Sequence, residues 1–106
     1  MLRTITPKLE EIVDAVEECS PRADFTLYFA GLYDPEEPAI FYNPSRIEDV
    51  KDFYVTIVHE ACHHIDDEDL YENEIELSAI KLIENQNLID YLGMTFEYVI
   101  ERYWGK

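Results

Sequence analysis

The stretch VTIVHEACHHID, residues 55–66, decides the fold of this chain, because it combines an apolar helical stripe with a cluster of histidines. Apolar residues recur at intervals of three and four from Ile47 to Ile65, a pattern typical of an amphipathic helix with one buried face. His59, His63 and His64 are the three histidines of the chain, and all of them fall within this stretch. We therefore expect a packed helix that presents imidazoles along part of its surface.

Before this stretch the sequence predicts one helix and then short strands. Thr6 has the form of an N-cap followed by Pro7 at the first helical position, and the apolar spacing that follows ends at residues 20–22. Residues 24–33 and 37–43 are rich in aromatic and β-branched residues and are separated by a proline-containing turn. Such segments are typical of strands, so we expect a small sheet of two or three strands.

After the strands the sequence predicts three helices. Residues 45–48 have the form of a capping box before the helix that carries the histidines, and residues 69–72 form a second box before a long helix. Gly93 fits the C′ position of that long helix, and Thr95 fits the N-cap of a last helix. This order predicts an α+β fold, a single domain over residues 1–106 with a small, mostly antiparallel sheet at one end.

The composition limits the classes of partner and the compartment. The chain carries 24 acidic and 8 basic residues, and its formal net charge of −16 would repel nucleic-acid backbones and anionic lipid surfaces. It has no run of about 20 apolar residues, so we expect no membrane span. Two cysteines, Cys19 and Cys62, are too few for a disulfide framework, and a secretory signal pattern is missing. We therefore expect a cytoplasmic protein.

The segment His59-Glu60-Ala61-Cys62-His63 has the spacing of a metal site on a helix. Residues four apart lie on one face, about 6 Å apart along the axis, so two imidazoles there can converge on one ion. This spacing is typical of zinc sites, and Glu60 can act as a general base on a water molecule at the metal. We expect His59 and His63 to bind Zn²⁺ and Glu60 to be catalytic. His64 lies off this face, and Cys62 is expected to be a small buried hydrophobe.

A catalytic zinc ion takes three protein ligands and keeps one position open, and no histidine follows His64. The third ligand is therefore expected to be a carboxylate of the next helix. If the two helices form a hairpin, residues 59–63 face residues 74–79. Glu76 then lies beside the apolar stripe, and we predict it as the third ligand. Glu72 at the turn and Glu84 beyond the expected site are the alternatives.

The two motifs together, HExxH and then Glu76-Leu77-Ser78-Ala79 on the next helix, resemble those of the gluzincin zinc peptidases. At this chain length the closest resemblance is to the minigluzincins, archaeal single-domain metallopeptidases. It implies a zincin-like domain with an N-terminal backing helix, a small sheet, an active-site helix, a glutamate helix and a C-terminal helix. It also implies that the strand over residues 39–43 borders the cleft and accepts a peptide as an added strand, and that residues 94–106 can block the cleft, as in a zymogen. The chain departs from the pattern at Ile80, where many gluzincins carry a polar residue four positions after the ligand glutamate.

The sequence thus predicts a zinc-dependent endopeptidase that hydrolyses peptides or proteins and is latent if residues 94–106 inhibit it. The alternative is a catalytically silent metal-binding module that regulates or binds another protein, because the chain is small and acidic and ends in an aromatic-rich segment. Tyr71, Tyr91 and Tyr98 are candidates for polarising a substrate carbonyl near the metal.

Overall fold

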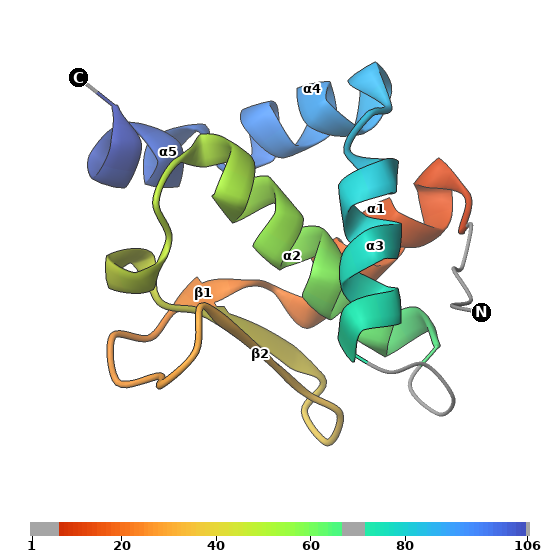
Figure 1. Ribbon diagram of the computed structural model, residues 1–106, viewed down its shortest axis with the longest axis horizontal. Coiled ribbons are helices and arrows are strands. Elements are labelled where there is room, and N and C mark those ends of the chain that lie inside the picture. The colour runs from red at the N-terminus through yellow and green to blue at the C-terminus, as the bar shows by residue number, and fades with distance from the viewer. Residues whose placement is uncertain (1–6, 67–71, 106) are drawn as a thin grey trace.

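The computed structural model describes residues 7–66 and 72–105, and it confirms the expected α+β class. Helix α2 runs through the middle of the molecule, with α1 and α3 packed against it and the sheet along a further side (Figure 1). The elements in the described part of the chain are α1 (Leu9–Cys19), β1 (Arg22–Ala23), β2 (Gly31–Asp34), β3 (Ala39–Tyr42), a 3₁₀ turn η1 (Pro44–Arg46), α2 (Val50–Ile65), α3 (Glu72–Leu82), α4 (Gln86–Thr95) and α5 (Glu97–Trp104).

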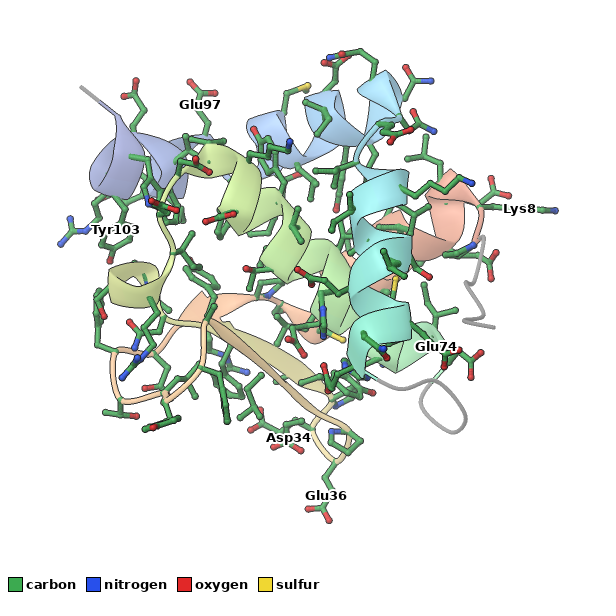
Figure 2. All side chains as sticks on the ribbon, in the orientation of Figure 1. Lys8, Asp34, Glu36, Glu74, Glu97 and Tyr103 are labelled. Atoms are coloured by element: carbon green, nitrogen blue, oxygen red, sulfur yellow. The ribbon has the colours of Figure 1, made fainter. Side chains whose placement is uncertain are left out.

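The sheet has the strand order β1-β3-β2. Strands β2 and β3 form an antiparallel hairpin in which Gly31 lies opposite Tyr42, and the short β1 pairs with β3 in parallel. Figure 2 shows Asp34 and Glu36 at the tip of this hairpin, pointing away from the body of the molecule. The prediction that residues 39–43 form the strand bordering the cleft is wrong, because β3 is the central strand and has neighbours on both sides. The edge strands are β1 and β2.

The strand expected over residues 24–33 forms only at its end, from Gly31 onward. The preceding residues form a loop that side chains hold in place. Asp24 accepts a hydrogen bond from the backbone N–H of Thr26 at 2.9 Å, and Asn43 Nδ2 donates to the carbonyl of Leu27 at 2.9 Å. Such bonds from side chain to backbone compete with strand pairing, which explains why an aromatic, β-branched sequence is a loop here.

Two helix boundaries differ from the predicted ones. Helix α2 begins at Val50, where Asp49 is the N-cap and accepts the backbone N–H of Asp52 at 2.9 Å, so residues 45–48 are not its capping box. The expected long helix is divided into α3 and α4, because the side chain of Asn85 accepts backbone N–H groups of the next turn and starts a new helix. Side-chain caps thus set both starts.

The caps predicted near the C-terminus are also wrong. Gly93 lies inside α4, where an added Cβ would come 3.2 Å from the hydroxyl of Tyr54, so glycine permits close packing there rather than ending the helix. Thr95 is the last residue of α4, and α5 has Phe96 at its N-cap without a side-chain cap. The caps predicted at Thr6 and at residues 69–71 lie outside the described residues.

The core is centred on Phe53, which is wholly buried. Its ring lies 5.3 Å from that of Phe96 and 5.0 Å from that of Trp104, measured between centroids. The indole N–H of Trp104 donates to the carbonyl of Ile47 at 3.2 Å. The C-terminal helix and the residue before it therefore pack against the first turns of α2. Among the described helices, none has the length and apolar character that crossing a membrane requires.

Candidate metal centre

Helix α2 brings His59, Glu60 and His63 together, as the motif predicted. The candidate ligand atoms of these three side chains all lie within 4.8 Å of one another, and the two imidazole centroids are 5.0 Å apart. The opposite face of the helix is wholly buried, and this burial fixes the rotation of the helix. Cys62 lies on that buried face, and burial raises the pKa of its thiol to about 12. The group could therefore bind a metal ion, and the expected buried position of Cys62 is confirmed.

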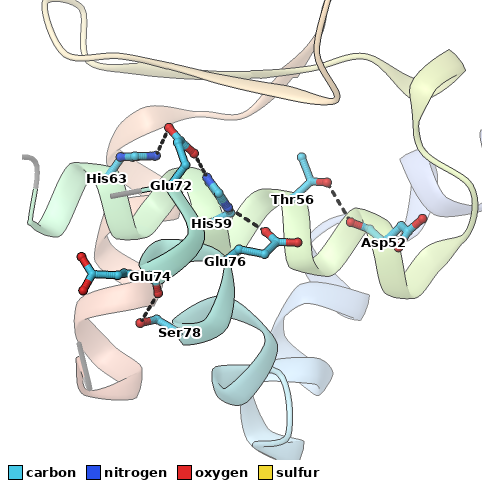
Figure 3. A network of polar contacts seen from close by, with 8 residues as sticks. All are labelled: Asp52, Thr56, His59, His63, Glu72, Glu74, Glu76 and Ser78. Carbon is cyan, nitrogen blue, oxygen red and sulfur yellow. Dashed lines mark hydrogen bonds and ion pairs between the residues drawn. The ribbon is translucent and has the colours of Figure 1, made fainter. Parts of the chain in front are cut away.

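Helix α3 adds two carboxylates, and they contact different sides of the His59 ring (Figure 3). Glu72 lies between the two imidazoles: its Oε2 is 2.7 Å from Nε2 of His59, and its Oε1 is 3.2 Å from Nε2 of His63. Glu76, one turn later, places Oε1 2.8 Å from Nδ1 of His59. Glu72 therefore contacts the Nε2 atoms of both histidines, whereas Glu76 contacts the other ring nitrogen of His59.

The hairpin expected from the sequence is present. Glu76, which lies within the predicted range 74–79, contacts His59, and Glu72, which lies before that range, contacts both His59 and His63. Figure 3 shows Glu74 on another side of α3, where Ser78 donates its hydroxyl to the Glu74 carbonyl. Glu84 is exposed, follows the end of α3 and does not line the cavity at the site.

The site strongly perturbs its own titratable groups. Glu60 is only 8% exposed, and burial raises its pKa to about 7, with the charge of His59 opposing and those of Glu72 and Glu76 adding to the rise. Burial acts to lower the pKa of His59, but the charge of Glu60 and the hydrogen bonds to Glu76 and Glu72 raise it overall. For Glu72, burial is outweighed by its contacts with both histidines, which lower its pKa. The metal-free site is thus a cluster of imidazole–carboxylate pairs.

A cavity of about 810 Å³ opens in front of this group. It lies between β2 with its preceding loop, one face of α2 and the first turns of α3. Gly31 forms part of the wall, and an added Cβ there would come 2.7 Å from Cγ2 of Thr56 and 3.1 Å from Oε2 of Glu60. A glycine inside a strand is a known sign of close backbone approach, so the sequence carried a signal for this contact.

The tyrosine at the cavity is Tyr33, which the sequence analysis did not select. Its hydroxyl lies 2.7 Å from Nδ1 of His64, and Nε2 of His64 lies 3.5 Å from Oε1 of Glu18. His64 lies in the last turn of α2, is partly buried, and joins α2 to β2 and α1. Residues two apart in a strand share a face, so the position of Tyr33 relative to Gly31 was the available signal.

Of the tyrosines proposed from the sequence, Tyr91 and Tyr98 do not line the cavity, and Tyr71 lies outside the described residues. The C-terminal segment also stays away from the site: residues 94–105 contribute no side chain to the cavity. They pack on the core near the start of α2 instead.

Comparison with known proteins gives no match to a family model, to a curated protein or to a solved structure. The chemistry of the site must therefore be argued from its own residues.

Proposed function

We propose that the chain is a zinc-dependent peptidase in which His59, His63 and Glu72 hold the metal and Glu60 is the general base. One observation carries the proposal: the Nε2 atoms of two imidazoles and the carboxylate of Glu72 converge at a cavity, beside a buried glutamate. Two imidazoles and one carboxylate are a ligand set of catalytic zinc sites, which keep a fourth position open. Glu72 takes the ligand role that the sequence analysis gave to Glu76.

Glu76 receives a different role in this proposal. A metal-binding histidine commonly bonds through its other ring nitrogen to a carboxylate, which fixes the orientation of the ring. The 2.8 Å contact of Glu76 with Nδ1 of His59 is such a support. With Glu72 as the ligand, a polar residue follows it by four positions, but the residue three positions on is Ile75 instead of the alanine of the Glu-x-x-Ala motif.

The chemistry divides between the metal and the chain. Zinc, when bound, lowers the pKa of a coordinated water molecule toward neutrality and stabilises negative charge on a carbonyl oxygen. Glu60 accepts a proton on its carboxylate from the attacking water and then donates that proton to the leaving amine. Gly31 lets the cavity wall approach Glu60 closely. The free edge of β2 lies along the cavity, where an extended peptide can pair with it as an added strand.

The ligand assignment is tested by zinc affinity, measured by competition with a chromophoric chelator. We expect Glu72→Ala to lower the affinity most and Glu76→Gln to lower it by about 10- to 100-fold, because it removes only the support of His59. Glu84→Ala is the matched control and should bind zinc as the wild type does. If Glu72→Ala retains wild-type affinity while Glu76→Ala loses zinc, Glu76 is the third ligand after all.

The peptidase activity is tested on the zinc-loaded full-length protein with a peptide library read by mass spectrometry. Glu60→Gln should keep its zinc and lose turnover, because the proton acceptor is gone. A wild-type protein that binds zinc but cleaves nothing in the library would support the silent metal-binding module. That residues 94–106 block the cleft and keep the enzyme inactive stays a prediction. Turnover by the intact chain would exclude it. Truncation is a poor test, because it removes Phe96 and Trp104 from the core.

A further inference from the structure

A basic residue lines the cavity, and it belongs to the 3₁₀ turn η1. Arg46 is the single lysine or arginine among the described residues that line the cavity, whereas four carboxylates line it. No described carboxylate lies within ion-pair distance of Arg46. In a chain with 24 acidic and 8 basic residues, a cationic side chain left without a carboxylate at the site cavity indicates recognition of a ligand.

Two contacts hold the side chain of Arg46 in place. Its Nε donates to the carbonyl of Leu27 at 3.2 Å, and its guanidinium carbon lies 5.3 Å from the centroid of the Tyr28 ring. The Leu27 carbonyl is itself fixed by Asn43, which is buried. Because Nε and one guanidinium face are used for support, the terminal nitrogens remain to donate. Such a fixed fork is suited to a carboxylate, and it loses little rotational freedom on binding.

The distance from Arg46 to the metal centre follows from the backbone. Arg46 is anchored beside residues 27–28, whereas Gly31 lies beside Glu60. Three or four residues of loop separate these two points, so they are at most roughly 10–14 Å apart. A peptide paired along β2 rises by about 3.3 Å per residue. Its carboxylate would therefore reach Arg46 when it lies no more than about four residues from the bond at the metal.

We propose that Arg46 binds a carboxylate of the peptide substrate and so selects the bond that is cleaved, which lies within about four residues of that carboxylate. This inference rests on the proposed peptidase function. The carboxylate can be the C-terminal group of a short peptide or an aspartate or glutamate side chain within a longer one. Asp52 also lines the cavity, but it stands in the first turn of α2, where the positive end of the helix dipole compensates its charge.

Binding to the metal-free protein tests this proposal without requiring turnover. The probes are fluorescein-labelled octapeptides of alanine and leucine, made as the free acid and as the C-terminal amide, with anisotropy as the readout. We expect the free acid to bind about tenfold more tightly, the effect of one charge-assisted hydrogen-bonded pair. Amidated peptides carrying one glutamate, compared with glutamine at the same position, distinguish a side-chain carboxylate from a terminal one.

The variants assign the effect to Arg46. Arg46→Gln should abolish the preference for the carboxylate, and Arg46→Lys, which keeps the charge without the fork, should reduce it. Arg22→Gln is the matched control, because Arg22 is an exposed arginine that pairs with Glu37 and does not line the cavity. Any of three results overturns the proposal. The first is equal binding of acid and amide together with equal binding of the glutamate and glutamine peptides. The others are a preference for the carboxylate that survives Arg46→Gln, and no binding of any probe.

Cleavage by the zinc-loaded protein separates this proposal from the peptidase function. With the free acid, mass spectrometry should locate cleavage at one position within about four residues of the C-terminus, and Arg46→Gln should disperse it. Binding that depends on Arg46 without cleavage refutes the peptidase but keeps the carboxylate site. If the cleavage positions do not depend on the carboxylate, the peptidase function is supported and the carboxylate site is refuted.

Discussion

Replacing Glu60 by glutamine measures how strongly the metal-free fold opposes a buried negative charge. Burial raises the pKa of Glu60 from 4.5 to about 7. Each unit of pKa difference corresponds to about 1.4 kcal/mol, so the charged form destabilises the folded state by about 3 kcal/mol. Glutamine has nearly the same shape and stays neutral, and it removes this cost. At pH 8 we expect metal-free Glu60→Gln to be more stable than the wild type by up to about 3 kcal/mol.

The sign of the pH dependence follows from the direction of the shift. Since the folded pKa lies above the unfolded one, the folded protein binds the extra proton between pH 4.5 and about 7. The free energy of unfolding therefore falls as the pH rises through this window, and the penalty is complete above it. His59, whose pKa is raised, loses its own stabilising contribution in the same direction. The charge of Glu60 is one cause of that raised pKa, so the difference between the two proteins reports the burial of Glu60 together with its coupling to His59.

The assay is urea unfolding in the presence of a chelator, followed by circular dichroism and by the fluorescence of Trp104 from pH 4 to 8.5. The two proteins should have similar stability near pH 4 and should diverge as the pH rises. Glu36→Gln is the control, because Glu36 is exposed at the tip of the hairpin (Figure 2) and its replacement should leave the curve unchanged. Equal or lower stability of Glu60→Gln at pH 8 would refute the reasoning, because the burial of Glu60 would then carry no electrostatic cost.

Three further substitutions test the packing around the site. Gly31→Ala should cost about 1–3 kcal/mol and reduce turnover, because the new Cβ meets Cγ2 of Thr56 at 2.7 Å; adding Thr56→Ser, which removes that methyl group, should restore stability in a double-mutant cycle. Phe53→Ala should cost about 3–5 kcal/mol in thermal or urea unfolding, since the ring is wholly buried between aromatic neighbours, and a loss below 1 kcal/mol would contradict its central position. Asn43→Ala should lower the free energy of unfolding by roughly 2–4 kcal/mol, because the buried Asn43 amide bonds to the loop carbonyls and to Ser45. Unchanged stability would show that the loop keeps its conformation without Asn43.

The features that the sequence predicted well are those decided within one helix. The apolar spacing from Val50 to Ile65 determines which side of α2 is buried, and that rotation brings His59, Glu60 and His63 to one surface without any other part of the chain. The order of helices and strands was similarly accessible, because each element has its own local pattern.

The features that the sequence could not predict depend on contacts between distant residues. The loop before β2 is held by Asn43, 16 residues beyond the Leu27 carbonyl that it binds, so its strand-like composition was misleading. Which carboxylate of α3 contacts both imidazoles depends on the offset between α2 and α3, and one helical turn separates Glu72 from Glu76. Apolar spacing identifies the packed face beside which Glu76 lies, but it does not determine how far one helix is shifted along the other.

Glu72 is the first residue of α3, while His59 and His63 belong to α2, so an ion held by all three would cross-link two helices that otherwise rely on side-chain packing and imidazole–carboxylate contacts. Binding to the folded state alone adds RT ln(1 + [L]/Kd) to its stability, about 4 kcal/mol at a free metal concentration of 1,000 times Kd. That gain is comparable to a large part of the stability of a small domain. The lifetime of this protein against unfolding and proteolysis would therefore follow the supply of the ion, so scarcity of the metal would remove the protein itself and not only its activity.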